Sequence, residues 1–357
     1  MYQSSKKADS GHGQVTVRDV AARAGVSPTV VSRVLHNKAT SIRVSAETAE
    51  RVRQAARDLG YRVNVMARLF RERQTMVIGV LHGVGFGRPH FSTGSQYFAE
   101  LMDGVLDSAL DHGYSLTFCP KLLGESPEDA MSDGRFDGLV WYSTYPSDEN
   151  RAVLEQCNVP LVLIHTLASE FKNRFPSVIC DNKQGIRLAL EHLWQLGHRK
   201  IAFALEHDDL FGEAVMRRDA FVELMANHGT PISEGDVIDV GLDRTGLHMY
   251  YAAGPRHTAV VGSNDGVAAS FLQFAPQYGV SVPQQLSVVG FDSTSYCNQL
   301  RPELTSVNQP LVTLGRSAVA LLVQVMQGVT LESYQLVFPC SFDVRNSTAP
   351  PPIGALI

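Results

Sequence analysis

One stripe of hydrogen-bonding side chains runs through the segment GVSPTVVSRVLHN, residues 25–37. Hydroxyl, guanidinium and imidazole groups recur there at the spacing i, i+3, i+4 and i+7, which places them on one helix face: Thr29, Ser32, Arg33 and His36. The apolar residues fall on the other face: Val31, Val34 and Leu35. Ser27 suits the N-cap and Pro28 the first helical position. A plain solvent-facing stripe would be richer in Glu and Lys, so this face is suited to binding a polar partner.

Two further helices are predicted around that segment. Before it, VTVRDVAARAGV has helical apolar spacing, Thr16 can cap the helix, and Gly25 can end it. After it, Ser45 can cap AETAERVRQAARDLG, which Gly60 ends. Two short helices joined by a glycine turn predict a helix-turn-helix within an all-α head, residues 15–62. Its expected core consists of Val20, Val31, Leu35, Val52 and Leu59.

The second helix of a helix-turn-helix lies in the DNA major groove, with its N-terminal residues against the base edges. Thr29 and Arg33 would then face bases, and an arginine suits the O6/N7 edge of guanine. Thr16, Ser27 and Ser32 would face phosphates, which position the protein without specifying sequence. The alternative interpretation is a helical hairpin that binds nothing.

The charge distribution separates the head from the remaining chain. Residues 1–75 contain 14 Lys or Arg and six Asp or Glu, a net charge of +8, whereas the other 282 residues carry −13. A basic head on an acidic body is typical of proteins that bind nucleic acid through the head. A basic, solvated tail would produce the same asymmetry.

Length and composition narrow the class of protein further. The chain has 357 residues, too many for one ordinary domain, and it lacks an apolar run of about 18 residues that could span a membrane. Residues 1–14 are polar and without the apolar centre of a secretory signal, so we expect a disordered tail on a cytoplasmic protein. The five cysteines are scattered, which favours reduced thiols over disulfides or a zinc site: Cys119, Cys157, Cys180, Cys297 and Cys340.

Beyond residue 75, short apolar runs alternate with helical segments. The expected strands form two sets of four: 76–81, 114–119, 138–143 and 160–165, then 200–205, 236–241, 258–262 and 286–292. The expected helices are 95–112, 148–157, 183–196, 213–228, 266–278 and 311–327. This alternation predicts an α/β body of two doubly wound parallel-sheet lobes over residues 76–350, followed by a tail at 351–357. Ligands of such sheets bind beyond the strand carboxyl ends, which here means a cleft between the lobes.

VTVRDVAARAGVSPTVVSRVLHN, together with VSAETAERVRQAARDLGYR, closely resembles the lac/galactose repressor family of bacterial transcription regulators. The body segments VICDNKQGIRLALEHLWQLGHRKIAF, VVGFDS and LTSVNQPLVTLGRSAVALL match as well, so the resemblance covers nearly all of the chain after residue 14. It implies a periplasmic-binding-protein-like body with three crossovers, and a repressor that a small effector controls. The heptad tail of tetrameric members is missing after VRNSTAP, so we expect a homodimer on a pseudo-palindromic double-stranded DNA operator.

The resemblance also assigns a hinge helix or linker to residues 63–75. Asn64 is expected at the DNA, and Phe70 stands where the family usually has the leucine that enters the minor groove, next to Leu69. An apolar wedge of this kind can kink a base step. The alternative is that Phe70 packs on the body as ordinary core. In the recognition helix, Val30 replaces the family's usual Thr, which would remove one phosphate contact.

Carried over position by position, the resemblance places an effector site in the cleft. Its expected residues are Tyr97, Phe98, His165, Arg217, Asn264, Asp265, Asp292 and Gln309. Arginine and acidic groups beside an aromatic side chain suit a sugar or a related polar metabolite. For each residue a salt bridge or a helix cap is the alternative role. His165 departs from the family's usual Asp, and a histidine there would make effector binding depend on pH.

The rival function is a small-molecule enzyme or transport binding protein built on the same body. G-x-S-x-G, H-E-x-x-H and P-loop motifs are missing from the sequence, so we predict neither catalysis nor a cofactor. GVGFGR, residues 83–88, follows a strand, but its glycines are spaced G-x-G-x-G, unlike a dinucleotide fingerprint. His82 and His90 flank that loop, and two loop histidines alone do not predict a metal site.

Overall fold

The computed structural model describes residues 15–36, 43–62, 74–82, 96–119, 134–142, 148–206, 212–254 and 256–352. The chain divides into two compact units, Met1–Gln74 (the head) and Thr75–Ile357 (the body). Some predictions concern residues outside the described ranges: the tail 1–14, Asn64, Leu69, Phe70, the GVGFGR loop and His90. Among the described residues, no helix is long and apolar enough to cross a membrane, and no group of His, Cys, Asp or Glu could hold a metal ion.

The head consists of three helices whose ends are fixed by local chemistry. They are α1 (Val17–Ala24), α2 (Pro28–His36) and α3 (Ala46–Asp58). Thr16 and Asp19 form a capping box at the start of α1, and the left-handed Gly25 ends that helix and begins the turn. The Ser45 side chain accepts from the Thr48 amide at the start of α3. The predicted helix-turn-helix is therefore confirmed at the level of its caps and turn.

Small residues allow the three head helices to approach closely. Val20, Val31 and Val52 are fully buried at the centre. Alanines from α1 and α3 complete the core: Ala21, Ala24, Ala55 and Ala56. Leu35 and Leu59, which were also expected inside, are only partly buried at the edge of this cluster. The prediction underestimated the alanines, which fill the short distances between helices better than leucine does.

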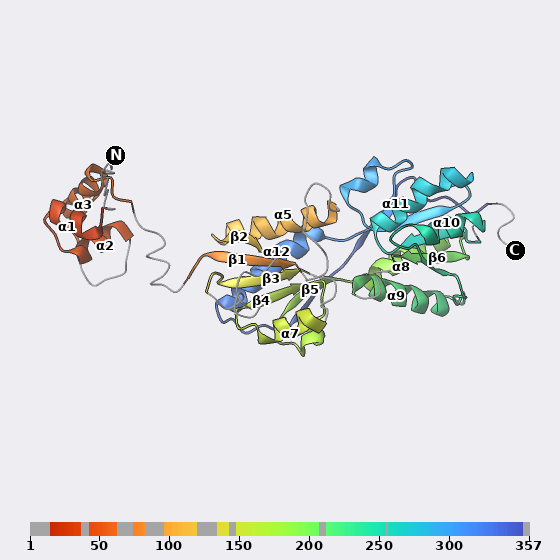
Figure 1. Ribbon diagram of the computed structural model, residues 1–357, viewed down its shortest axis with the longest axis horizontal. Helices are drawn as coiled ribbons and strands as arrows, with labels where there is room; N and C mark the ends of the chain where they lie inside the picture. Colours follow the sequence, from red (N-terminus) through yellow and green to blue (C-terminus); the bar gives the residue numbers. More distant parts are fainter. Residues whose placement is uncertain are drawn as a thin grey trace, which may run out of the picture. The chain divides into compact units, whose positions relative to one another are not determined.

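The first lobe of the body is a parallel sheet with helices on both faces (Figure 1). Its strands lie in the order β11 (Gln335–Phe338), β5 (Ser177–Cys180), β4 (Leu161–Ile164), β3 (Gly138–Tyr142), β1 (Val77–His82) and β2 (Ser115–Cys119). Helices α5 (Gln96–Asp111) and α12 (Leu311–Met326) cover one face, and α7 (Asp148–Gln156) covers the other. Side chains alternate between the faces: Val140 and Val162 point toward α5 and α12, and Leu139 and Leu161 toward α7.

The second lobe repeats this arrangement. Its strands lie in the order β12 (Ser341–Asp343), β10 (Thr305–Asn308), β9 (Ser287–Asp292), β8 (Ala259–Gly262), β6 (Ile201–Leu205) and β7 (Val237–Asp239). Only β12 runs antiparallel to its neighbour among these described strands. Helices α10 (Thr245–Ala252) and α11 (Asp265–Phe274) pack on one face, and α8 (Asn182–Leu196) and α9 (Glu213–Asn227) on the other (Figure 1).

The chain passes between the lobes three times, as the family resemblance implied. The first crossover joins β5 to α8, the second joins β10 to α12, and the third joins β11 to β12. Four strands were missed in the sequence: β5, β10, β11 and β12. Each has three or four residues, too few for a periodic pattern to be recognised, and each is held by its neighbours in the sheet. The predicted helix over 266–278 is in fact α11 followed by a 3₁₀ turn at Ala275–Tyr278.

Two glycines set how closely α5 and α12 pack in the first lobe. A Cβ atom on Gly104 would lie 2.1 Å from the carbonyl oxygen of Val312, and one on Gly315 would lie 2.2 Å from that of Leu101. Both obstacles are backbone atoms, which no side-chain rotation can move. The two helices are therefore in backbone contact, and only glycine fits at these positions.

We predict that Gly315→Ala destabilises the body, although the same change in an open helix position gains about 1 kcal/mol of helix propensity. Overpacking should instead cost roughly 1–3 kcal/mol, measured by urea unfolding of the full chain. Thr313→Ala, at an exposed position of α12, is the matched control and should change stability by less than about 0.5 kcal/mol. A stabilised Gly315→Ala protein would contradict the close contact.

Candidate DNA-binding face and inter-lobe site

The start of helix α2 presents the polar side chains that its sequence predicts. Ser27, Pro28 and Thr29 are exposed at its start, whereas Val31 is fully buried on the opposite side. Ser32 and Arg33 are half-buried along the same helix. The first turn of α2 is thus the part of the helix most accessible to a partner. A recognition helix uses this end against base edges.

Two of the three hydroxyl residues predicted to face phosphates, Thr16 and Ser27, lie at helix starts. Thr16 Oγ1 donates to Asp19 Oδ2 at 2.7 Å, and this bond and the one from the Thr16 amide lower the pKa of Asp19. Ser27 Oγ accepts from the Val30 amide at 3.4 Å. Both residues remain exposed while they cap α1 and α2. Helix N-termini favour anions, so these positions are compatible with phosphate contacts.

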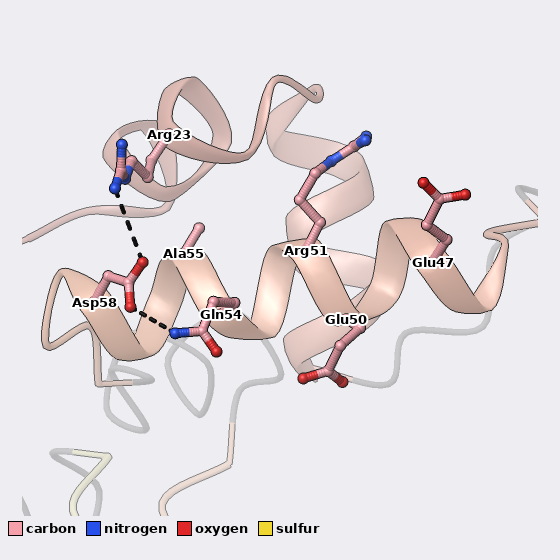
Figure 2. A pocket seen from close by; sticks show the side chains of 7 residues that line it. All are labelled: Arg23, Glu47, Glu50, Arg51, Gln54, Ala55 and Asp58. Atoms are coloured by element: carbon pink, nitrogen blue, oxygen red, sulfur yellow. Dashed lines mark hydrogen bonds and ion pairs between the residues drawn. The ribbon is translucent and has the colours of Figure 1, made fainter.

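A groove between α1 and α3 has the opposite electrostatic character (Figure 2). Its lining includes three carboxylates and two arginines: Arg23, Glu47, Glu50, Arg51, Gln54, Ala55 and Asp58. Asp58 lies 3.9 Å from Arg23 and accepts a 2.7 Å hydrogen bond from Gln54. Carboxylates repel a phosphate backbone, so this side of the head is the less suitable one for DNA.

In the body, five of the eight expected effector residues lie together where the lobes join: Tyr97, His165, Arg217, Asp292 and Gln309. His165, after β4 in the first lobe, lies with Nδ1 3.0 Å from Glu213 Oε2 at the start of α9 in the second lobe. The His165 side chain is 0% exposed and that of Glu213 is 4% exposed. On the other side of the ring, the Tyr97 hydroxyl contacts His165 Nε2. A close, buried contact between an imidazole and a carboxylate therefore joins the two lobes.

Arg217 lies at the centre of this group and is held by three bonds. Its Nε donates to Asn182 Oδ1 at 2.8 Å, its Nη1 to the Ser263 carbonyl at 2.7 Å, and its Nη2 to Glu213 at 3.2 Å. The guanidinium also stacks on the Phe291 ring at 3.8 Å, which favours a cation at this position. We call the polar residues gathered here the inter-lobe cluster: Tyr97, His165, Asn182, Glu213, Arg217, Asp292 and Gln309.

The pKa values of two carboxyl groups of the inter-lobe cluster are shifted in opposite directions. Burial raises the pKa of Glu213, but the close His165 and Arg217 outweigh it and lower the pKa to about 2. Burial raises the pKa of Asp292 well above its ordinary value, because Arg217, 3.7 Å from its Oδ1, offsets burial only in part and the nearby Asp265 carboxyl group raises the pKa further. Glu213 is therefore the firmly ionised partner of Arg217. Such divergent carboxyl groups mark a candidate functional site.

Backbone conformation also marks the inter-lobe cluster as a candidate site. His165 has φ of +66° and Asp292 has φ of +119°, a region that residues other than glycine rarely adopt. These residues lie at the carboxyl ends of β4 and β9, one in each lobe. Strained residues concentrate where function requires a fixed side-chain direction. The strain therefore supports the assignment of both residues to the site.

Three of the expected effector residues have structural roles in this arrangement. Asn264 caps α11 through a 2.8 Å bond from the Val267 amide. Asp265 accepts from the Thr294 amide at 2.9 Å and from Ser306 Oγ at 2.6 Å. Phe98 is buried in the core, 5.5 Å from the Tyr142 ring. These are the alternative roles that the sequence left open, and effector contact by these three residues stays a prediction.

The sequence analysis missed Glu213, Asn182 and Phe291. Glu213 precedes Arg217 by four residues on a helix, and this spacing favours an ion pair. The spacing is therefore a local sequence signal for the pair between Glu213 and Arg217. Asn182 begins α8 directly after the first crossover, and Phe291 precedes Asp292 in β9. Their roles depend on how the lobes meet, which no local pattern encodes.

Comparisons with known proteins agree with this architecture. Residues 16–64 match the family described as bacterial regulatory proteins, lacI family, and residues 190–348 match a periplasmic binding protein-like domain. The ribose operon repressor of Halalkalibacterium halodurans is 30% identical over 93% of this chain and 97% of its own length. Among solved structures, a lac repressor dimer bound to operator and the anti-inducer ONPF aligns with a TM-score of 0.75 at 26% identity, covering 94% of this chain and 99% of that one. A complex of the transcriptional regulator CelR with cellobiose aligns with a TM-score of 0.68 at 27% identity, covering 93% and 99%.

We predict that Glu213→Gln destabilises the body by about 3–5 kcal/mol at neutral pH, because it removes the close carboxylate of the buried Arg217 and leaves it only the Asp292 carboxyl group, 3.7 Å away. Glu223→Gln is the matched control on α9, since its 2.7 Å pair with Lys183 is exposed and should contribute less than about 1 kcal/mol. Chemical denaturation of the full chain measures both. Equal effects of the two substitutions would refute the importance of the buried pair.

The destabilisation caused by Glu213→Gln should depend on pH. The Glu213 pKa of about 2 lies below the ordinary value of 4.5, so its contribution to stability is complete above about pH 5 and declines as the pH falls toward 2. The stability difference between the wild type and Glu213→Gln should therefore narrow in acid. A difference that stays constant down to pH 2 would contradict the low pKa.

Proposed function

Because this chain belongs to the lacI family of bacterial regulatory proteins, we propose that it is a transcription repressor that binds a pseudo-palindromic operator. The observation that carries the proposal is the exposed polar start of α2 on a head with a net charge of +8. In this proposal Thr29 and Arg33 read bases, and Thr16, Ser27, Pro28 and Ser32 lie against the DNA backbone. A protein that binds an operator works beside the chromosome, so we expect it in the cytoplasm.

The proposed functional unit is a homodimer. Each lobe exposes large apolar side chains: Leu106, Leu110 and Phe118 in the first, and Leu242, Met249 and Tyr278 in the second. Apolar side chains in such numbers support a protein contact on each lobe. A two-fold dimer would place two heads on two half-sites, and the related lac repressor is a dimer in its operator complex.

We propose that a sugar or related metabolite acts as the effector at the inter-lobe cluster. The bound cellobiose of CelR and the ribose operon repressor among the relatives support this class. An effector that binds one arrangement of the lobes better than the other shifts the population of lobe arrangements. In the proposal, residues 63–75 pass this shift to the head, with Asn64 at the DNA and Phe70 as the minor-groove wedge.

An enzyme or a transport binding protein on the same body is the rival function. Removal of residues 1–75 separates the classes: a regulator would lose DNA binding and keep its ligand, whereas an enzyme would keep turnover.

Selection of bound duplexes from a random DNA pool, at about 150 mM salt, tests the proposal directly. We expect an enriched pseudo-palindrome, and its central step would reveal whether Phe70 enters the minor groove. If nothing is enriched, the selection is repeated with a mixture of sugars, since a co-repressor would then be required. Failure of both selections would refute sequence-specific DNA binding.

We predict that Arg33→Met weakens binding to the selected operator by about 1–3 kcal/mol and relaxes specificity at one base pair in each half-site. Arg53→Met removes an equal charge from the exposed face of α3, where Arg53 pairs with Glu50 at 3.3 Å, and should have little effect on specificity. Electrophoretic mobility shifts on operator variants measure both. A uniform loss over all sequences would instead place Arg33 at a phosphate.

A further inference from the structure

The Glu213 carboxylate is surrounded by polar groups of the protein. Its Oε1 lies 3.3 Å from Asn182 Nδ2 and 3.6 Å from the Cys180 thiol. Its Oε2 lies 3.2 Å from Arg217 Nη2 and 3.0 Å from His165 Nδ1. An ionised carboxylate has about four lone-pair positions, and the four polar groups packed around this one leave little capacity for a ligand. Glu213 is thus an anion whose partners are supplied by the protein itself, and it does not need a ligand as a partner.

Arg217 is correspondingly occupied. Glu213 balances its charge, and Asn182 and the Ser263 carbonyl take two more of its N–H groups. Asp292 adds a second acidic group at 3.7 Å. An anionic effector would therefore enter beside two carboxyl groups, with the only arginine of the inter-lobe cluster already neutralised. Burying an unpaired negative charge is too costly for such a ligand to bind well.

Two acceptor groups of the inter-lobe cluster have few hydrogen-bond partners among the described residues. Gln309 Oε1 is buried and has no hydrogen-bond partner among the residues that the structure describes. Asp292 Oδ1 accepts from Gln309 Nε2 at 2.6 Å, and its other close contact is the longer one to Arg217. A buried acceptor without a donor costs free energy, which a ligand recovers by bringing an O–H group. This part of the cluster therefore selects ligands that donate hydrogen bonds.

We propose that Glu213 occupies Arg217 as an internal anion, so that the inter-lobe site accepts uncharged, hydroxyl-rich effectors and rejects phosphorylated or carboxylate ones. This inference rests on the proposed effector function of the inter-lobe cluster. Glu213 is then a specificity-determining residue, and its removal should convert the site into one that binds anions through Arg217.

Inorganic phosphate is the probe, titrated calorimetrically into the full chain at constant ionic strength. We expect Glu213→Ala to bind phosphate at least about tenfold more tightly than the wild type, because it frees Arg217. Glu213→Ser serves if the alanine variant does not fold. Glu223→Ala, which removes an exposed carboxylate from the same helix, controls for net charge and for phosphate binding by the basic head, and should behave like the wild type.

Three results of the phosphate titrations would overturn the inference. They are wild-type binding of phosphate as tight as that of the Glu213 variants, no gain in a folded Glu213 variant, and a gain of the same size in Glu223→Ala. A wild-type protein that binds ribose 5-phosphate more tightly than ribose would also overturn it. The DNA selection is independent of these titrations. Failure of the proposed regulator function and failure of the proposed exclusion of anions would therefore give different results.

Discussion

The buried ion pair between Glu213 and Arg217, extended to His165, is the interaction on which the body depends most. It connects the end of β4 in one lobe with the start of α9 in the other, through side chains that are nearly inaccessible to solvent. Burying these charges is tolerable only because each finds several partners. The arrangement of the lobes and the composition of the candidate site are therefore set by the same few residues.

The crossovers bring the chain to this interaction from three directions. Asn182 follows the first crossover, and Gln309 lies at the second, between β10 and α12. The third is bonded to the first, because Gln184 exchanges two hydrogen bonds with the backbone of Cys340, at 2.8 and 3.1 Å. A ligand at the inter-lobe cluster would thus lie beside two of the segments that connect the lobes.

Local chemistry made the head predictable, whereas the site needed the tertiary structure. Thr16, Gly25 and Ser45 specify helix ends through bonds within four residues of themselves, and the structure places them as expected. Arg217 was assigned by resemblance, but its partners Asn182 and Ser263 lie far away in sequence. The short strands β5 and β10 were missed for a similar reason, since sheet pairing rather than their own pattern makes them strands. Residues whose role depends on two lobes meeting have no local signature to read.

The glycine contact between α5 and α12 has a consequence for the first lobe as a binding surface. α5 carries Tyr97 in its first turn, and α12 begins two residues after Gln309, so the contact ties together two site residues separated by more than half of the chain. Helices in backbone contact cannot slide past one another without a clash. These two side chains therefore behave as parts of one rigid unit. A ligand that binds to this preassembled unit does not need to order it. Less of the binding free energy is therefore lost as entropy.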